Sequence, residues 1–259
     1  LDKVKDQFGN AGLEDSSPSA VTYNIDTTIP VVSLANATYS PGFGAVTSAD
    51  TAKLSFTLTN TVTTTLAVSS GTSAAPPTGI SISTTGGVSC THVDIHSANT
   101  SGGSIWISGC TGDGSVLVTV NANIATSTGG LHNTASTQKT VWVQNSSPTV
   151  TLSGLAATGG PNGENQFDAT FSNFVNTLSV DNSGGEIVVS GCSGTQPTVA
   201  ITTTDLADHT VAWFNLTGGT CTVGDLVTIS FHLENVTDKA GNVGQVADNP
   251  ADITYLVGP

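Results

Sequence analysis

Three residues of types that bind transition metals, His92, Asp94 and His96, occupy alternate positions along one stretch of the chain. Successive side chains of a β-strand point to opposite faces, so in an extended stretch all three would lie on one face. Imidazole and carboxylate groups are zinc ligands, and a zinc site is therefore one interpretation. A solvent-facing polar stripe on a strand has the same pattern, and we favour this second interpretation.

Four carboxylates, Glu164, Asp168, Asp181 and Glu186, lie in a region rich in loop residues. A pair of carboxylates can hydrolyse a glycosidic bond when their separation is suitable, but spacing along the chain does not define that separation. The sequence contains no G-x-S-x-G elbow, no P-loop and no C-x-x-C pair. We therefore expect a protein that is not an enzyme.

A phrase of the form V-x-D-x-x-G-N-x-G occurs twice, at residues 4–12 and 236–244. Each copy is followed by a polar loop that contains Pro, and then by a β-rich stretch that ends in Thr-Tyr. Such self-similarity is typical of a tandem array. Arrays provide reach, display and binding, which is a second reason to expect no catalysis.

The phrase divides the chain into three parts. We interpret residues 1–29 as the last hairpin of a preceding module, or as a donated strand, and residues 30–147 and 148–259 as two complete modules. Each complete module has about seven short strands separated by Gly, Asn and Pro turns within about 110 residues, a pattern typical of an antiparallel immunoglobulin-like β-sandwich. We predict an all-β chain of tandem sandwiches with almost no helix.

The four cysteines fall two per module at equivalent places, which predicts the bridges Cys90–Cys110 and Cys192–Cys221. Each bridge is expected to staple one hairpin on its polar face, rather than to join the two sheets through the core. Paired cysteines in a chain of this composition indicate an oxidising compartment. We expect an extracellular or cell-surface location.

The strand pattern supports the first of these bridges. With Cys90 opposite Cys110, Val93 faces Ile107 and the other face of the hairpin is polar apart from Trp106. The corresponding register in the next module places Val199 near Phe214.

Trp213 is then expected to point outward, as Trp106 does. Two outward tryptophans are candidates for ligand contact, for example by stacking on a sugar. Burial under a neighbouring loop is the alternative for both.

The charge balance restricts the partners. Nineteen acidic residues face five lysines and no arginine, for a net charge of −14. Phosphate recognition depends on Arg and Lys, so we expect neither nucleic acid nor an anionic membrane surface as a partner. The chain has no apolar run that would insert in a membrane. Acidic, oxygen-rich surfaces suit hard cations such as calcium, and charge that only maintains solubility is the alternative.

Several phrases together resemble the bacterial Ig-like repeats of large surface adhesins. They are V-K-D-Q-F-G-N at 4–10, V-T-D-K-A-G-N at 236–242, the joint Y-N-I-D-T-T-I-P at 23–30, and the strand phrases F-T-L-T-N-T-V and F-S-N-F-V. The resemblance covers the whole chain. It implies β-sandwich beads in a long stalk, in some cases stiffened by calcium at the joints.

Transferred to this sequence, the resemblance implies a calcium site at the first joint, formed by Asp26 with Asp6 and the Asn10 side chain. Backbone and water oxygens would complete its six to eight ligands. A solvated Asp26 that shapes an Asx turn is the alternative. The second joint, residues 145–148, has no acidic residue, and we do not expect calcium there.

These observations predict a structural or adhesive stalk module of a bacterial surface protein that serves cell attachment or display. Its partners would be neighbouring modules, copies of the same protein, or a surface ligand such as a glycan. One alternative is a filament subunit that polymerises through residues 1–28. Another is a carbohydrate-binding module of a secreted protein.

Overall fold

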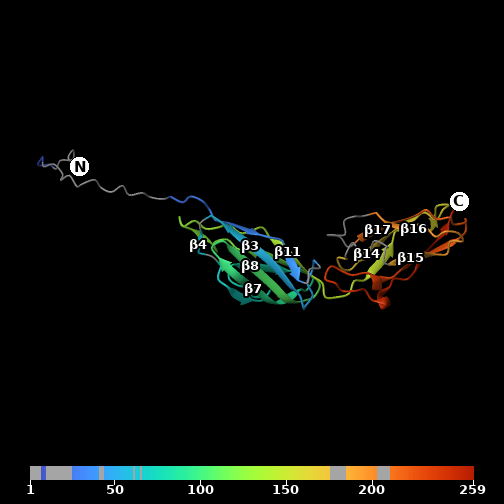
Figure 1. The fold of residues 1–259 in the computed structure, drawn as a ribbon, viewed down its shortest axis with the longest axis horizontal. Helices are drawn as coiled ribbons and strands as arrows, with labels where there is room; N and C mark the ends of the chain where they lie inside the picture. Colours follow the sequence, from blue (N-terminus) through green and yellow to red (C-terminus); the bar gives the residue numbers. More distant parts are fainter. Residues whose placement is uncertain are drawn as a thin grey trace.

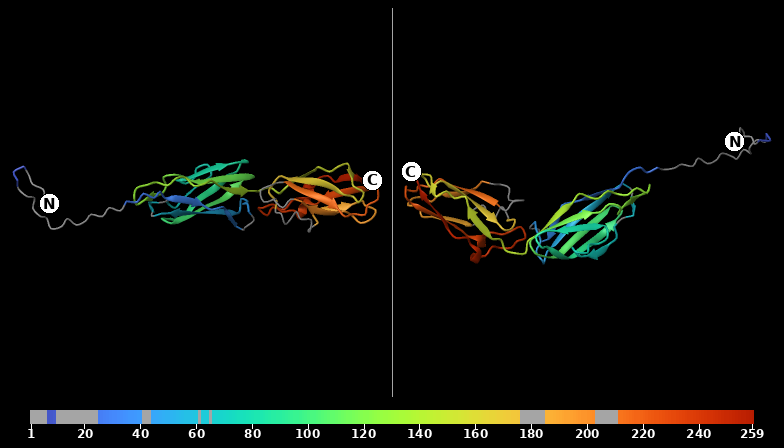
Figure 2. Two further views of the ribbon diagram at one scale, coloured as in Figure 1. Left: turned by 90° about the horizontal axis from the view of Figure 1, so that it is seen from above. Right: turned by 180° about the vertical axis from the view of Figure 1, so that it is seen from behind.

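The computed structural model describes residues 7–9, 25–40, 44–60, 62–64, 66–175, 185–202 and 211–259. Most of the predicted leading hairpin, residues 1–6 and 10–24, therefore lies outside the described residues. The regular structure is nearly all β, as predicted, and the helices of the described ranges are two 3-10 turns, η2 (Leu233–Asn235) and η3 (Val246–Asp248). Two β-sandwiches lie end to end along the long axis (Figure 1 and Figure 2).

The first sandwich contains eleven strands. They are β1 (Val31–Leu34), β2 (Thr38–Ser40), β3 (Thr51–Thr59), β4 (Val62–Thr64), β5 (Ser69–Gly71), β6 (Ile80–Thr84), β7 (Ser89–Asn99), β8 (Gly102–Thr111), β9 (Gly114–Val120), β10 (Thr126–Ser127) and β11 (Lys139–Val143). One sheet has the order β1-β3-β8-β7-β5, with β2 also paired to β3, and the facing sheet has the order β11-β9-β6. Strands β4 and β10 form a separate pair.

The second sandwich contains eight strands. They are β12 (Val150–Ser153), β13 (Thr158–Gly159), β14 (Asn165–Phe171), β15 (Ile187–Ser190), β16 (Thr198–Ile201), β17 (Val211–Thr217), β18 (Leu226–Phe231) and β19 (Ile253–Val257). Its sheets have the orders β12-β14-β17-β16 and β13-β19-β18-β15. Only the short β13–β19 pair is parallel among the named strands.

Each sandwich has its own core between its two sheets. Along β3, residues Ala52, Leu54, Phe56 and Leu58 are buried and the residues between them face outward. This alternation is what an antiparallel sheet with one solvated face requires. The buried residues form two separate clusters, one within residues 32–143 and one within residues 150–257.

The predicted register of the first hairpin is confirmed, since Val93 pairs with Ile107 and Cys90 with Cys110. The bridge Cys90–Cys110 is present, but its predicted place on the polar face was wrong. Both cysteines are buried and belong to the core cluster. Gly109, with φ of 61°, lies in the left-handed region that favours glycine. It interrupts the alternation between Ser108 and Cys110, so the cysteines turn inward.

The bridge Cys192–Cys221 is also present, but the register predicted for its hairpin was wrong by two residues. Val199 pairs with Leu216 instead of Phe214. Both cysteines lie in the loops that flank β16 and β17, so their pairing does not set the strand register. A shift of two residues keeps each side chain on its face, and Trp213 points outward as predicted.

Removal of the buried bridge tests its place in the core. We expect the double variant Cys90→Ala/Cys110→Ala to lose about 3 kcal/mol of unfolding free energy from loop closure, and more from the cavity that two buried sulfurs leave. The matched control is Cys192→Ala/Cys221→Ala, in which Cys221 is only partly buried. Urea unfolding of both variants measures the difference. An equal or smaller loss in the first variant would contradict the core position.

Candidate functional site

The segment that joins the two sandwiches, residues 144–149, is held first by the sandwich that precedes it. The carboxylate of Asp113, in the turn between β8 and β9, accepts hydrogen bonds from the backbone N–H of Asn145 at 2.6 Å and of Ser146 at 3.0 Å. The Ser146 hydroxyl donates to the same carboxylate at 2.7 Å. Partial burial acts to raise the pKa of Asp113, but the hydrogen bonds from Ser146 and Asn145 outweigh it, and the pKa lies below its usual value.

The Asn145 side chain adds three further contacts to the first sandwich. Its Oδ1 accepts from the backbone N–H of Ser48 at 2.7 Å. Its Nδ2 donates to the carbonyl oxygens of Cys110 at 3.2 Å and Gly112 at 2.8 Å. The linker is therefore tied to the turn that directly follows the buried disulfide.

The second sandwich holds the same linker through the repeated phrase. Asp238 is 1 % exposed, and its Oδ1 accepts from the backbone N–H groups of Ala240 and Asn242, both at 2.9 Å. Its Oδ2 accepts from the side-chain Nδ2 of Asn173 at 3.0 Å and of Asn242 at 2.9 Å. Gly241 between them has φ of 89°, which explains the glycine of the phrase.

The two amides that Asp238 holds reach the linker backbone. Asn242 Nδ2 donates to the carbonyl oxygen of Gln144 at 2.9 Å. Asn173 Nδ2 donates to the carbonyl oxygen of Ser146 at 2.7 Å. We call Asp238, Asn242 and Asn173 the carboxylate clamp. The D-x-x-G-N phrase thus forms a loop that grips the joint before its own sandwich.

The two sandwiches also touch each other directly. The rings of Trp142 and Phe174 lie 4.5 Å apart between centroids. The backbone N–H of Ala45 donates to the carbonyl oxygen of Lys239, inside the clamp loop, at 3.1 Å. Side chain, linker and loop contacts therefore meet at one junction.

At the first joint the carboxylate belongs to the linker, and a side chain of the sandwich donates to it. Asp26 lies on the linker and accepts from the Thr28 backbone N–H at 3.0 Å, which forms an Asx turn. Its other oxygen accepts from the Thr128 hydroxyl at 2.8 Å. Hydrogen bonds from Thr28 first, and then from Thr128, hold the pKa of Asp26 well below its usual value. Asp6 and Asn10 lie outside the described residues, so calcium at this joint stays a prediction.

The sequence pattern signalled only part of this junction. The repeated phrase pointed to Asp238 and Asn242 by its recurrence, although not to their role. Asp113 and Asn173 were missed, because their linker partners lie 33 and 27 residues away in the chain.

Within the described ranges, the other candidate residues do not come together in one site. In the described part of the chain, the metal-binding groups that lie close together are Cys192, Cys221 and Asp225, and the two sulfurs of this group are joined in a disulfide. His92, Asp94 and His96 share one strand face, as predicted, but His96 stacks on the Trp106 ring at 4.6 Å between centroids.

Two carboxylates of the loop-rich region lie far apart. Glu164, which directly precedes β14, and Asp168 on that strand are four positions apart, which is about 13 Å in an extended strand and more than a glycosidase pair needs. Glu186 is buried, and Asp181 lies outside the described residues.

The two tryptophans differ in how much of their surface is free. Trp106 is 39 % exposed, and its indole N–H donates to the Ser104 hydroxyl at 3.0 Å. Trp213 is 53 % exposed. No helix in the described ranges is long and apolar enough to cross a membrane.

No family model and no curated protein matches the chain. Among solved structures, it is similar to the Escherichia coli adhesin FdeC, with 18 % identity, a TM-score of 0.40, and coverage of 93 % of this chain and 67 % of that one. It is also similar to the Yersinia pseudotuberculosis adhesin InvE, with 12 % identity, a TM-score of 0.27, and coverage of 85 % and 58 %. These neighbours are Ig-like adhesin domains, and the likeness concerns the fold alone.

Loss of the Asp238 carboxylate should be costly. In Asp238→Ala two backbone N–H groups lose the acceptor they have now, and the Asn173 and Asn242 amides each lose one of their acceptors. We expect a loss of about 3 kcal/mol in unfolding free energy. Asp225→Ala is the matched control, because Asp225 also accepts several hydrogen bonds but is only partly buried. Urea unfolding measures the loss of unfolding free energy in both variants. Equal losses would show that the buried Asp238 carboxylate stabilises the protein no more than the partly buried Asp225 carboxylate does.

Proposed function

We propose that this chain is a stalk segment of a bacterial surface protein, in which tandem Ig-like sandwiches hold a binding end away from the cell. The observation that carries this proposal is the junction. A linker that only connects two domains needs few contacts, and a polar one behaves as a flexible coil. Here both sandwiches hydrogen-bond one short linker: the first sandwich holds Asn145 and Ser146, and the second holds Gln144 and Ser146.

The junction explains how a stalk would keep its reach. Bending at the joint requires the loss of the Asn242 and Asn173 bonds to the linker, or of the Asp113 bonds on the other side. The bonds from Asn242, Asn173 and the Asn145 backbone are partly buried. Those to the Asp113 carboxylate are charge-assisted. A chain of such joints would extend as a rod.

The disulfides support the proposed location. Cys90–Cys110 and Cys192–Cys221 are both formed, and the described residues include no free cysteine. Disulfides persist in oxidising environments, which supports an extracellular or cell-surface setting. An adhesive role fits the same setting, and the adhesins FdeC and InvE have the same class of fold.

The proposal is tested by light scattering after size exclusion, over a concentration series, followed by small-angle X-ray scattering. A stalk segment should remain a single elongated species of 25.9 kDa at every concentration, with calcium or with a chelator. Growth into an open series of multiples would contradict it and favour the filament alternative. A compact particle would contradict the end-to-end rod.

A further inference from the structure

The outward face of the sheet β12-β14-β17-β16 carries two adjoining depressions. One, of about 440 Å³, is lined by Glu164, Thr217 and the 154–158 segment, among others. The second, of about 330 Å³, is lined by Trp213 and Thr202. Both are also lined by Gln166 and Asn215, which are opposite each other on β14 and β17. The two depressions therefore form one shallow groove with this amide pair in the middle.

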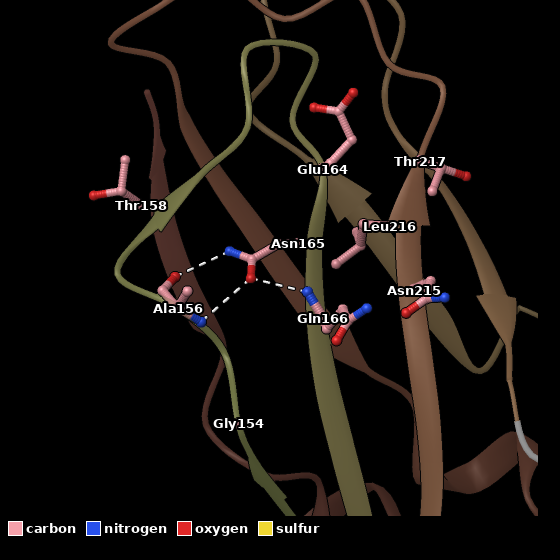
Figure 3. Close-up of a pocket in the computed structure, with 9 residues that line it drawn as sticks. All are labelled: Gly154, Ala156, Thr158, Glu164, Asn165, Gln166, Asn215, Leu216 and Thr217. Atoms are coloured by element: carbon pink, nitrogen blue, oxygen red, sulfur yellow. Dashed lines mark hydrogen bonds between the residues drawn. The ribbon is translucent and has the colours of Figure 1, made fainter. Parts of the chain in front are cut away.

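Hydrogen bonds within the protein hold one edge of the groove, the 154–158 segment, in place. Asn165 accepts a hydrogen bond from the Ala156 backbone N–H at 3.2 Å and donates to its carbonyl oxygen at 2.9 Å. Figure 3 shows these bonds tying the 154–158 segment to β14, while the Gln166 and Asn215 side chains project from neighbouring strands. The walls are therefore set by the protein itself.

Three side chains that line the groove have unused hydrogen-bonding groups with respect to the described residues. Within the described residues, neither the Gln166 nor the Asn215 side-chain amide has a hydrogen-bond partner, and the same holds for the Trp213 indole N–H. Trp213 lies two positions from Asn215 on β17, so the three side chains point to the same side. A free aromatic ring beside two free planar amides is a set that recognises sugar hydroxyls and the apolar face of a sugar ring.

The corresponding place in the first sandwich lacks this set. Trp106 on β8 and Trp213 on β17 occupy matching positions in the two sheet orders. The Trp106 ring, however, is stacked on His96, with Lys53 Nζ 6.0 Å from its centroid. The indole N–H of Trp106 already donates a hydrogen bond to the Ser104 hydroxyl. Trp106 is therefore a built-in comparison for Trp213.

The charges around the groove select the kind of sugar. Glu164 lines one depression, and Asp168 pairs with Trp213 across β14 and β17. The sequence has no Lys or Arg between residues 140 and 238. A sulfated or sialylated glycan would meet only like charge here.

We propose that this groove binds a neutral glycan, which stacks on Trp213 and is hydrogen-bonded by Gln166 and Asn215. The inference goes beyond the stalk function, because a stalk needs no ligand on its side. It would make the second sandwich a contact point along the rod, as well as a spacer.

The test uses a printed array of neutral oligosaccharides beside sialylated and sulfated ones, followed by calorimetric titration of the best neutral binder. We expect the intact chain to bind neutral glycans, and Trp213→Ala to weaken binding by at least about tenfold. Trp106→Ala is the matched control and should bind as the intact chain does. The double variant Gln166→Ala/Asn215→Ala should also weaken binding, and it gives a second readout that leaves the tryptophan in place.

Three results would overturn the proposal. They are the absence of binding to any neutral glycan on the array, a preference for the anionic glycans, and an equal loss in Trp106→Ala and Trp213→Ala. Thermal unfolding of each variant distinguishes a loss of glycan binding from a loss of the folded structure. The scattering experiment on the rod is independent of glycan, so failure here leaves the stalk proposal standing on its own test.

Discussion

The arrangement of the two sandwiches depends on one buried carboxylate. Asp238 is almost fully buried, and a buried charge is stable only when hydrogen bonds or opposite charges compensate it. Four N–H donors do so here, two from the backbone of its own loop and two from side-chain amides. The same two side-chain amides also donate to carbonyl oxygens of the linker. The hydrogen bonds that compensate the Asp238 carboxylate therefore also orient the groups that bind the linker.

That coupling makes the linker part of both sandwiches. On one side Asp113 accepts its N–H groups, and on the other Asn242 and Asn173 donate to its carbonyl oxygens. The first sandwich therefore accepts hydrogen bonds from the linker N–H groups, and the second donates hydrogen bonds to the linker carbonyl oxygens. The Trp142–Phe174 contact adds apolar surface to this polar frame. The groove around Trp213 lies on a sheet face that the junction contacts described above do not use.

Much of the fold could be predicted from the sequence because alternation in antiparallel strands is a local signal. The Val93–Ile107 register followed from it. The inward turn of Cys90 and Cys110 could not be predicted, since it depends on the backbone of Gly109. The register beside Val199 was missed because the neighbouring cysteines lie in loops.

The junction was predictable only in outline. Recurrence of the D-x-x-G-N phrase marked Asp238 and Asn242, but a local pattern says nothing about which distant backbone they meet. Asp113 gave no signal, because a single acid in a turn is common. The long-range contacts that make the joint appear only when the chain is folded.

The most direct test of the account is a pulsed dipolar distance measurement across the junction. Spin labels on non-natural residues at the exposed positions 57 and 188 leave the disulfides intact. We expect one narrow distance distribution for the intact chain, unchanged by a chelator, and a broad one for Asn242→Ala. A broad distribution in the intact chain, or a narrow one that survives Asn242→Ala, would contradict it.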